Sequence, residues 1–171
     1  MSQPETGSPS SLFLLSSAAY NPDSYGLFEE GRAEAVRQGE ILHSHIRNTP
    51  VIILSSMRRW SIQTATLVAR KSPTFIYDPD SNQRDYLDPE EYARGISDIR
   101  QGLWNTWSTL SACGLRKLLL VMHPHDMHKL AGVVSGAGLS SSPEIRPARL
   151  WLAEPGRVVR LGMNGQEWPV T

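Results

Sequence analysis

The sequence predicts an α/β fold of three layers, α/β/α, with a mostly parallel sheet and a C-terminal hairpin at one edge. Two observations predict it. Short, continuously apolar segments that suit strands buried on both faces alternate with segments of helical periodicity. Near the C-terminus, two strand-like runs flank a turn that contains proline and glycine, as expected for a hairpin.

Length and composition limit the domain count and the classes of partner. The 171 residues, 40% of them hydrophobic, suffice for one ordinary core. We therefore expect a single domain over residues 12–171 after a loose polar tail over residues 1–11. Seventeen basic residues balance seventeen acidic ones, which argues against nucleic acid or a membrane as a partner. With one cysteine and no apolar run of membrane-spanning length, the protein is expected to be soluble and cytoplasmic.

The first elements form a strand, a helix and a strand. Residues 12–15 (LFLL) are all apolar and predict a buried strand that opens onto a turn of small residues. A helix is expected from residue 29 to about residue 47, because Glu29 and Glu30 suit the positive end of a helix and apolar residues then recur at helical spacing. Residues 51–54 (VIIL) predict a second strand covered on both faces.

A second helix and a third strand follow. Ser55 and Ser56 are candidate N-caps of this helix, and Pro73 ends it. Its expected buried face consists of Met57, Trp60, Thr64, Leu67 and Val68. Residues 74–77 (TFIY) then predict the third strand.

The second half of the chain contributes two more helices, a strand and the hairpin. A long helix is expected over residues 88–114, because it starts with an aspartate cap, a proline and a glutamate. Residues 118–122 (LLLVM) are the clearest strand in the sequence, and a helix is expected from about residue 126 to residue 137. Residues 150–152 and 158–161 are the two strands of the expected hairpin.

Three segments follow the patterns of one known family, in the same order. Residues 12–18 match its opening strand, and residues 27–35 (LFEEGRAEA) match a helix start of the form Leu-Thr-x-x-Gly-x-x-x-Ala. Residues 55–65 (SSMRRWSIQTA) match the form Ser-Ser-Pro-x-x-Arg-Ala-x-Gln-Thr-Ala. The chain therefore resembles the histidine phosphatases, the phosphoglycerate mutase-like superfamily, and within it the compact branch that includes the bacterial phosphohistidine phosphatases.

The resemblance fails at the residues that carry the family's chemistry. In the family the first strand ends in Arg-His-Gly, in which the histidine is phosphorylated during turnover and the arginine holds the phosphate. Ser16, Ser17 and Ala18 stand at these positions, and Trp60 stands where a second arginine belongs. His123 alone is retained, as the counterpart of the family's second histidine.

These substitutions remove what phosphate binding requires. A phosphoryl group carries about −1.5 to −2 charges near pH 7, and each charge-assisted hydrogen bond to it is worth roughly 1.5 to 3 kcal/mol. Losing two arginines should weaken binding on the order of a thousandfold, and losing the histidine removes the covalent route. The sequence predicts a catalytically inactive pseudophosphatase that acts as a binding or regulatory module for an unidentified protein partner.

Two alternatives stay open. The first is a divergent phosphatase for a phosphomonoester or phosphohistidine, with Ser17 as the nucleophile and His123 as its base. Ser16, Arg58 and Arg59 would then bind the phosphate.

The second alternative is an oligomeric structural subunit. It would assemble through the long helix expected over residues 88–114, where Trp104 and Trp107 are candidates for a partner surface.

Neither a metal site nor a cofactor is predicted. Residues 123–128 contain three histidines and an aspartate, but their spacing around a proline turn does not match a zinc site. We expect His125 and His128 at the rim of the pocket or on the surface. His43 and His45 are two residues apart on a helix, do not share a face, and are also expected at the surface.

Overall fold

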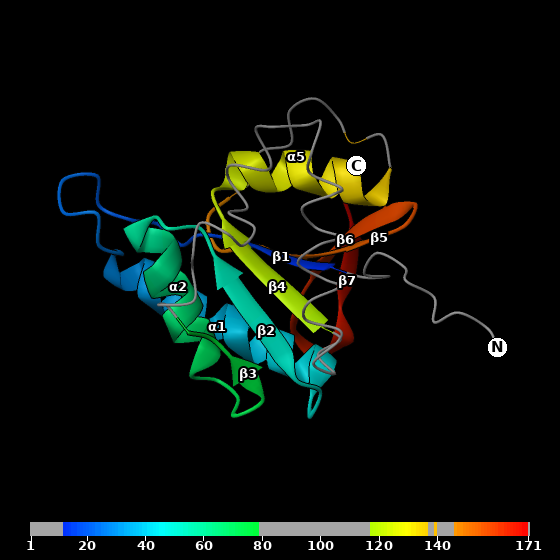
Figure 1. The fold of residues 1–171 in the computed structure, drawn as a ribbon, viewed down its shortest axis with the longest axis horizontal. Coiled ribbons are helices and arrows are strands. Elements are labelled where there is room, and N and C mark those ends of the chain that lie inside the picture. The colour runs from blue at the N-terminus through cyan, green and yellow to red at the C-terminus, as the bar shows by residue number, and fades with distance from the viewer. Residues whose placement is uncertain (1–11, 79–116, 137–138, 140–145, 171) are drawn as a thin grey trace.

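The computed structural model describes residues 12–78, 117–136, 139 and 146–170, which form three layers (Figure 1). The expected tail over residues 1–11 and the long helix over residues 88–114 lie outside the described residues. Within the described part, no helix is both long and apolar enough to cross a membrane.

The described residues form one sheet of seven strands in the order β3-β2-β4-β1-β5-β6-β7. The strands are β1 (Leu12–Ser16), β2 (Val51–Ser55), β3 (Phe75–Ile76), β4 (Lys117–Met122), β5 (Leu150–Glu154), β6 (Arg157–Leu161) and β7 (Glu167–Pro169). The first four are parallel, with Leu14 opposite Leu120 across β1 and β4. The last three are antiparallel, and β5 also pairs antiparallel with β1. The expected parallel character thus holds for one half of the sheet, and the hairpin continues into β7.

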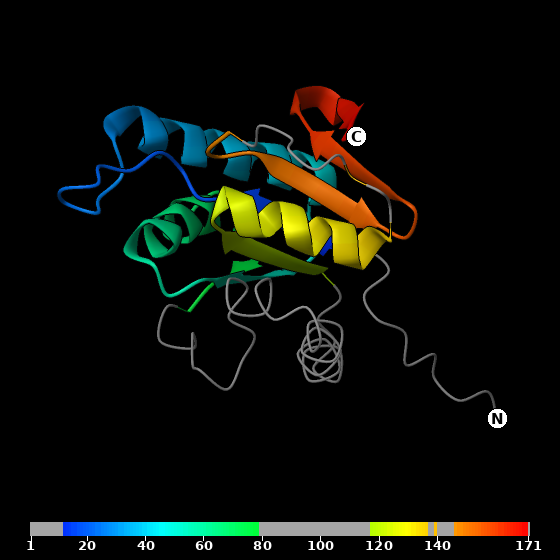
Figure 2. The same cartoon turned by 90° about the horizontal axis from the view of Figure 1, so that it is seen from above.

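Helices cover both faces of this sheet, as the α/β/α prediction requires. Figure 2 shows α5 (Pro124–Ser135) on one side and α1 (Glu29–Ile46) with α2 (Arg59–Ala69) on the other. The alternation of side chains along β1 divides the core accordingly. Leu14 packs with Met127 and Leu130 of α5, whereas Leu15 packs with Leu42 of α1. The fold class predicted from the sequence is therefore confirmed.

The start of α2 differs from the prediction. The helix begins at Arg59, and the N-cap residue Arg58 makes no side-chain capping bond. Ser55 is the last residue of β2, and Ser56 is buried without a hydrogen-bond partner for its hydroxyl within the described residues. Met57, expected on the buried face, is 54% exposed. The two serines continue the pairing of β2 with β4 and do not cap α2, because the N–H of Ser56 donates to Val121 O of β4.

The start of α1 is determined by a close approach of two backbones. Its N-cap residue Phe28 makes no side-chain capping bond, because phenylalanine has no polar side-chain atom to accept one. Gly31 lies in the first turn, and a Cβ at this position would clash with the carbonyl oxygen of Ala19. The N–H of Phe28 donates to the same oxygen at 3.0 Å. The missing side chain of Gly31 thus lets α1 dock on the loop that follows β1.

Candidate functional site

Ser17 and His123 come together because β1 and β4 are adjacent parallel strands that end at the same edge of the sheet. Ser16 is opposite Met122, and the N–H of Ser17 donates to Met122 O at 2.8 Å. The next residues along both strands line one cavity of about 220 Å³. Its described lining consists of Ser17, Ala18, Ala19, Tyr20, His123, Pro124 and Pro147. We call this the strand-end cavity.

Ser16 has a structural role at the base of this edge. It is completely buried, and its hydroxyl donates to Arg146 O at 2.9 Å and accepts from Arg149 N–H at 2.7 Å. These two bonds tie the segment before β5 to the end of β1. Ser16 does not line the strand-end cavity. It was predicted to be a phosphate ligand, and that role stays a prediction.

His123 is held by the start of α5. It is the N-cap residue of this helix, and its Nδ1 accepts a hydrogen bond from the N–H of His125 at 3.2 Å. In the neutral ring, an accepting Nδ1 places the proton on Nε2. The second nitrogen of His123 is then a hydrogen-bond donor, which suits it to hold an acceptor group and not to take a proton from Ser17.

Trp60, which the resemblance aligns with the family's second arginine, is part of an aromatic stack. Its ring lies parallel to that of Tyr20, with centroids 4.1 Å apart, and Tyr25 follows at 5.9 Å. Thr64 fixes the loop beside it by accepting the Ala18 N–H at 3.0 Å and donating to Trp60 O at 2.7 Å. Trp60 thus packs against Tyr20, which lines the strand-end cavity. Trp60 itself is not among the described residues that line it.

Arg58 and Arg59 lie outside this cavity. Both side chains are exposed, and neither is among the described residues that line it. The guanidinium carbon of Arg58 is 5.9 Å from the centroid of the Trp60 ring. Their predicted role in phosphate binding stays a prediction.

The remaining histidines do not form a metal site within the described residues, where no group of three potential ligands comes together. His125 is exposed, as expected. His43 and His128 are half-buried and not fully exposed, and their Nδ1 and Nε2 atoms, respectively, are buried without a partner in the described residues. His45 is also half-buried, and its ring bonds Gly162 O at 3.1 Å.

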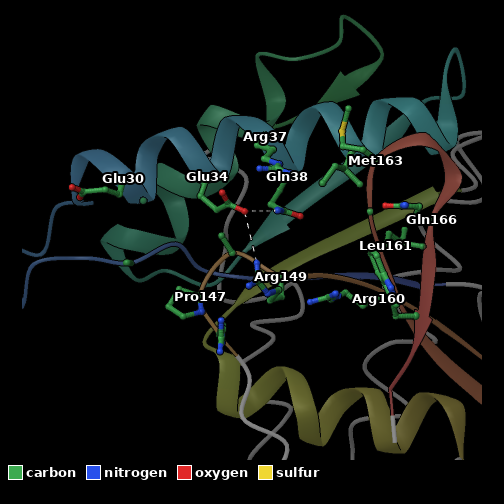
Figure 3. Close-up of a pocket in the computed structure, with 17 residues that line it drawn as sticks. Glu30, Glu34, Arg37, Gln38, Pro147, Arg149, Arg160, Leu161, Met163 and Gln166 are labelled. Carbon is green, nitrogen blue, oxygen red and sulfur yellow. Dashed lines mark hydrogen bonds and ion pairs between the residues drawn. The ribbon is translucent and has the colours of Figure 1, made fainter.

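A second, larger cavity contains the charged groups that the first one lacks. It measures about 660 Å³ and lies between α1 on one side and, on the other, the segment before β5 and residues 160–168 (Figure 3). Four arginines line it: Arg37, Arg146, Arg149 and Arg160. We call it the arginine cavity. It shares Ala19 and Pro147 with the strand-end cavity, so the two are neighbours.

Sequence reasoning did not find the arginine cavity. The four arginines come from α1, the segment before β5, and β6, and no local motif joins them. The nearest signal was Arg146 and Arg149 on either side of Pro147.

Burial and the neighbouring arginines both disfavour the charge of Arg149 in this cavity. The pKa of Arg149 is lowered by burial, then by the charge of Arg160, with further contributions from Arg146 and Arg37. Glu34 opposes the shift, but its carboxylate is 3.8 Å from Arg149 and also accepts a hydrogen bond from Gln38 at 2.9 Å. One shared carboxylate does not neutralise this group of cations.

Comparison with known proteins assigns the fold. No family model matches the sequence, and no curated protein matches it. A protein histidine phosphatase SixA complexed with tungstate superposes with a TM-score of 0.53 at 13% identity, covering 94% of this chain and 96% of that one. A mycobacterial glucosyl-3-phosphoglycerate phosphatase gives 0.55 at 15%, covering 94% and 99%. A phosphoglycerate mutase from Plasmodium falciparum gives 0.52 at 15%, covering 92% of each.

The three structures share one architecture with this chain, which therefore has the fold of the histidine phosphatases and phosphoglycerate mutases. Each of these alignments covers more than nine tenths of both chains. At these identities the likeness concerns the fold alone, and the activity has to be argued from the side chains of the site.

Proposed function

We propose that this chain is a pseudophosphatase: a histidine phosphatase-like protein without phosphatase activity that acts in the cytoplasm as a binding or regulatory module for a protein partner. One observation carries the proposal. The cavity where β1 and β4 end, which is the catalytic position implied by the family resemblance, is lined in the described residues by three side chains with polar groups: Ser17, Tyr20 and His123. No arginine or lysine is among them.

The missing cations would prevent stable binding of a phosphoryl group. Phosphate carries about −1.5 to −2 charges near pH 7, and proteins bind it through arginines, lysines or several backbone N–H groups. At this edge the N–H groups of Ser17 and Ala18 already donate to Met122 O and to Thr64. These two N–H groups are therefore not free to bind a phosphoryl group in place of the lost arginine.

The missing base would prevent Ser17 from replacing the nucleophile. A serine hydroxyl needs a neighbouring group that accepts its proton. His123 is the only histidine that lines the cavity within the described residues, and in its neutral form the bond from His125 leaves Nε2 protonated. The hydroxyl of Ser17 makes no hydrogen bond to any described residue. Ser17 and His123 both line the cavity, but neutral His123 has no free nitrogen to accept the proton of the Ser17 hydroxyl.

The direct test is an assay of the purified protein with p-nitrophenyl phosphate and with a phosphohistidine peptide. Wild type, Ser17→Ala and His123→Ala are compared at equal concentration. The proposal predicts the same background rate for all three. A wild-type rate that both substitutions abolish would refute it.

That same outcome would establish the divergent phosphatase, the second candidate. One observation favours it: Ser17 and His123, which the sequence singled out together, do line one cavity. A rate lost in His123→Ala alone would point instead to a phosphorylated histidine. Tungstate, bound in the solved histidine phosphatase, serves as a binding probe, and saturable binding that Ser17→Ala weakens would also favour an active site.

A further inference from the structure

We propose that the arginine cavity binds a small organic phosphate monoester, with the phosphate between Arg37 of α1 and the arginines of β6 and of the segment before β5, and the organic body against Trp168 and Met163. The proposal concerns a site separate from the strand-end cavity and is independent of whether that cavity has activity.

Charge is the first argument. Four guanidinium groups face two carboxylates, Glu30 and Glu34, so the lining carries a net charge of about +2. Within the described residues, the one ion pair among these six side chains is the loose contact of 3.8 Å between Arg149 and Glu34. A phosphate monoester supplies close to two negative charges at pH 7 and would compensate this excess.

The direction of the arginines is the second argument. Arg37 comes from α1, Arg149 from the segment before β5 and Arg160 from β6, and Figure 3 shows Arg37 on a different wall of the cavity from the other two. Phosphate presents three terminal oxygens in a tetrahedral arrangement, so it can accept hydrogen bonds from several walls at once. A carboxylate has two coplanar oxygens and suits one arginine fork.

The apolar part of the lining is the third argument. A cavity of about 660 Å³ lies in the range that holds a whole small molecule, and inorganic phosphate would leave most of it empty. Trp168 and Met163 line it although they are 41% and 36% exposed. Such residues beside a cationic group offer a surface for a flat or apolar body.

Trp168 is also held in one orientation before any ligand binds. The guanidinium carbon of Arg160 lies 4.4 Å from the centroid of its ring. A Cβ on Gly162 would clash with Cζ3 and Cη2 of the same ring, so this glycine lets the ring pack directly on the backbone. The wall is therefore pre-organised, which lowers the entropic cost of binding.

The experiment is a calorimetric titration of the full chain with adenosine 5′-monophosphate and with 1-naphthyl phosphate as probes. Both should bind saturably below about 1 mM, at least about tenfold more tightly than inorganic phosphate, adenosine or succinate. Binding of neither probe would overturn the proposal. Equal affinity for inorganic phosphate would refute the role of the organic body, and equal affinity for succinate would refute the preference for phosphate.

Three variants locate the site. Arg37 is exposed, so Arg37→Gln should fold normally and weaken both probes about tenfold or more. Arg32→Gln removes the same charge from the same helix outside the cavity and should change affinity less than about twofold. Glu34→Gln removes a competing carboxylate and should tighten binding by about fivefold, a gain that a merely structural role would not produce.

These results separate the two proposals. Loss of probe binding in Arg37→Gln with no phosphatase turnover supports both. Turnover that depends on His123 would refute the pseudophosphatase and leave the arginine-dependent binding intact. Equal effects of Arg37→Gln and Arg32→Gln would show that long-range charge, not this cavity, holds the anion, and would overturn the anion site alone.

Discussion

The strand-end cavity and the arginine cavity are neighbours that share Ala19 and Pro147, yet their chemistry is opposite. The first lies where the fold places catalysis in the family it resembles, and no arginine or lysine lines it in the described residues. The second is lined by four arginines and two glutamates. The comparison shows that the arginines of this part of the chain gather in the cavity beside the one where the resemblance places catalysis.

Ala19 lines both cavities, and its position depends on Gly31, where α1 touches the loop that contains Ala19. Gly31→Ala should lower the free energy of unfolding by about 3 kcal/mol, because the added Cβ meets backbone that cannot move aside. Denaturant unfolding measures this loss. Gly132→Ala is the matched control on α5, since nothing lies within 4 Å of its added Cβ and alanine favours helix by about 1 kcal/mol. Similar losses at both glycines would contradict the close approach.

The link between the two cavities can be broken at Ser16, whose hydroxyl holds the segment that contains Arg146 and Arg149. Ser16→Ala should cost about 2 kcal/mol, because the Arg149 N–H and the Arg146 carbonyl lose their partner. It should also weaken anion binding in the arginine cavity. Ser17→Ala, which removes no hydrogen bond to a described residue, should cost less than about 0.5 kcal/mol in the same unfolding experiment. A reversed order would refute the structural role of Ser16.

The strand-end cavity alone is tested at Trp60. Trp60→Ala should cost about 1.5 kcal/mol, because the ring stacks on Tyr20 and Tyr25. Trp60→Phe keeps an aromatic ring and should recover most of that loss. Neither variant should change anion affinity in the arginine cavity, and a change there would show that the two cavities are coupled.

A small stability effect is expected inside the arginine cavity. Arg149→Met should change the free energy of unfolding by less than about 1 kcal/mol without ligand, because burial and the neighbouring arginines already disfavour its charge. The same variant should weaken binding of a phosphate monoester about tenfold. A large loss of stability with unchanged binding would assign Arg149 to the structure and not to the site.

Much of the fold could be predicted because its strands are continuous apolar runs. Residues 12–15, 51–54 and 118–122 each lie within a strand of the parallel half of the sheet, and the helix expected over residues 29–47 is α1 within one residue. Short polar and edge elements could not be predicted. β7 has three residues including Pro169, without the alternation that marks a strand. Ser55 and Ser56 looked like a helix cap because the sequence alone does not show where β2 stops pairing with β4.

The strand-end cavity could be predicted because its residues follow two strands directly. Ser17 and His123 are each the first residue after a buried run, so strand adjacency brings them together. The arginine cavity is formed by tertiary packing of Arg37 against residues more than a hundred positions later, and no spacing encodes that. The partners of His43 and His45 likewise depend on Phe75 and Gly162, far along the chain.

The account depends most on the absence of a phosphorylated intermediate. Intact-protein mass measurement under neutral and alkaline conditions, after rapid mixing with a phosphohistidine peptide, tests this without requiring turnover. The account predicts one species with the mass of the unmodified chain at every time point. A species heavier by one phosphoryl group that disappears in Ser17→Ala or His123→Ala would contradict it.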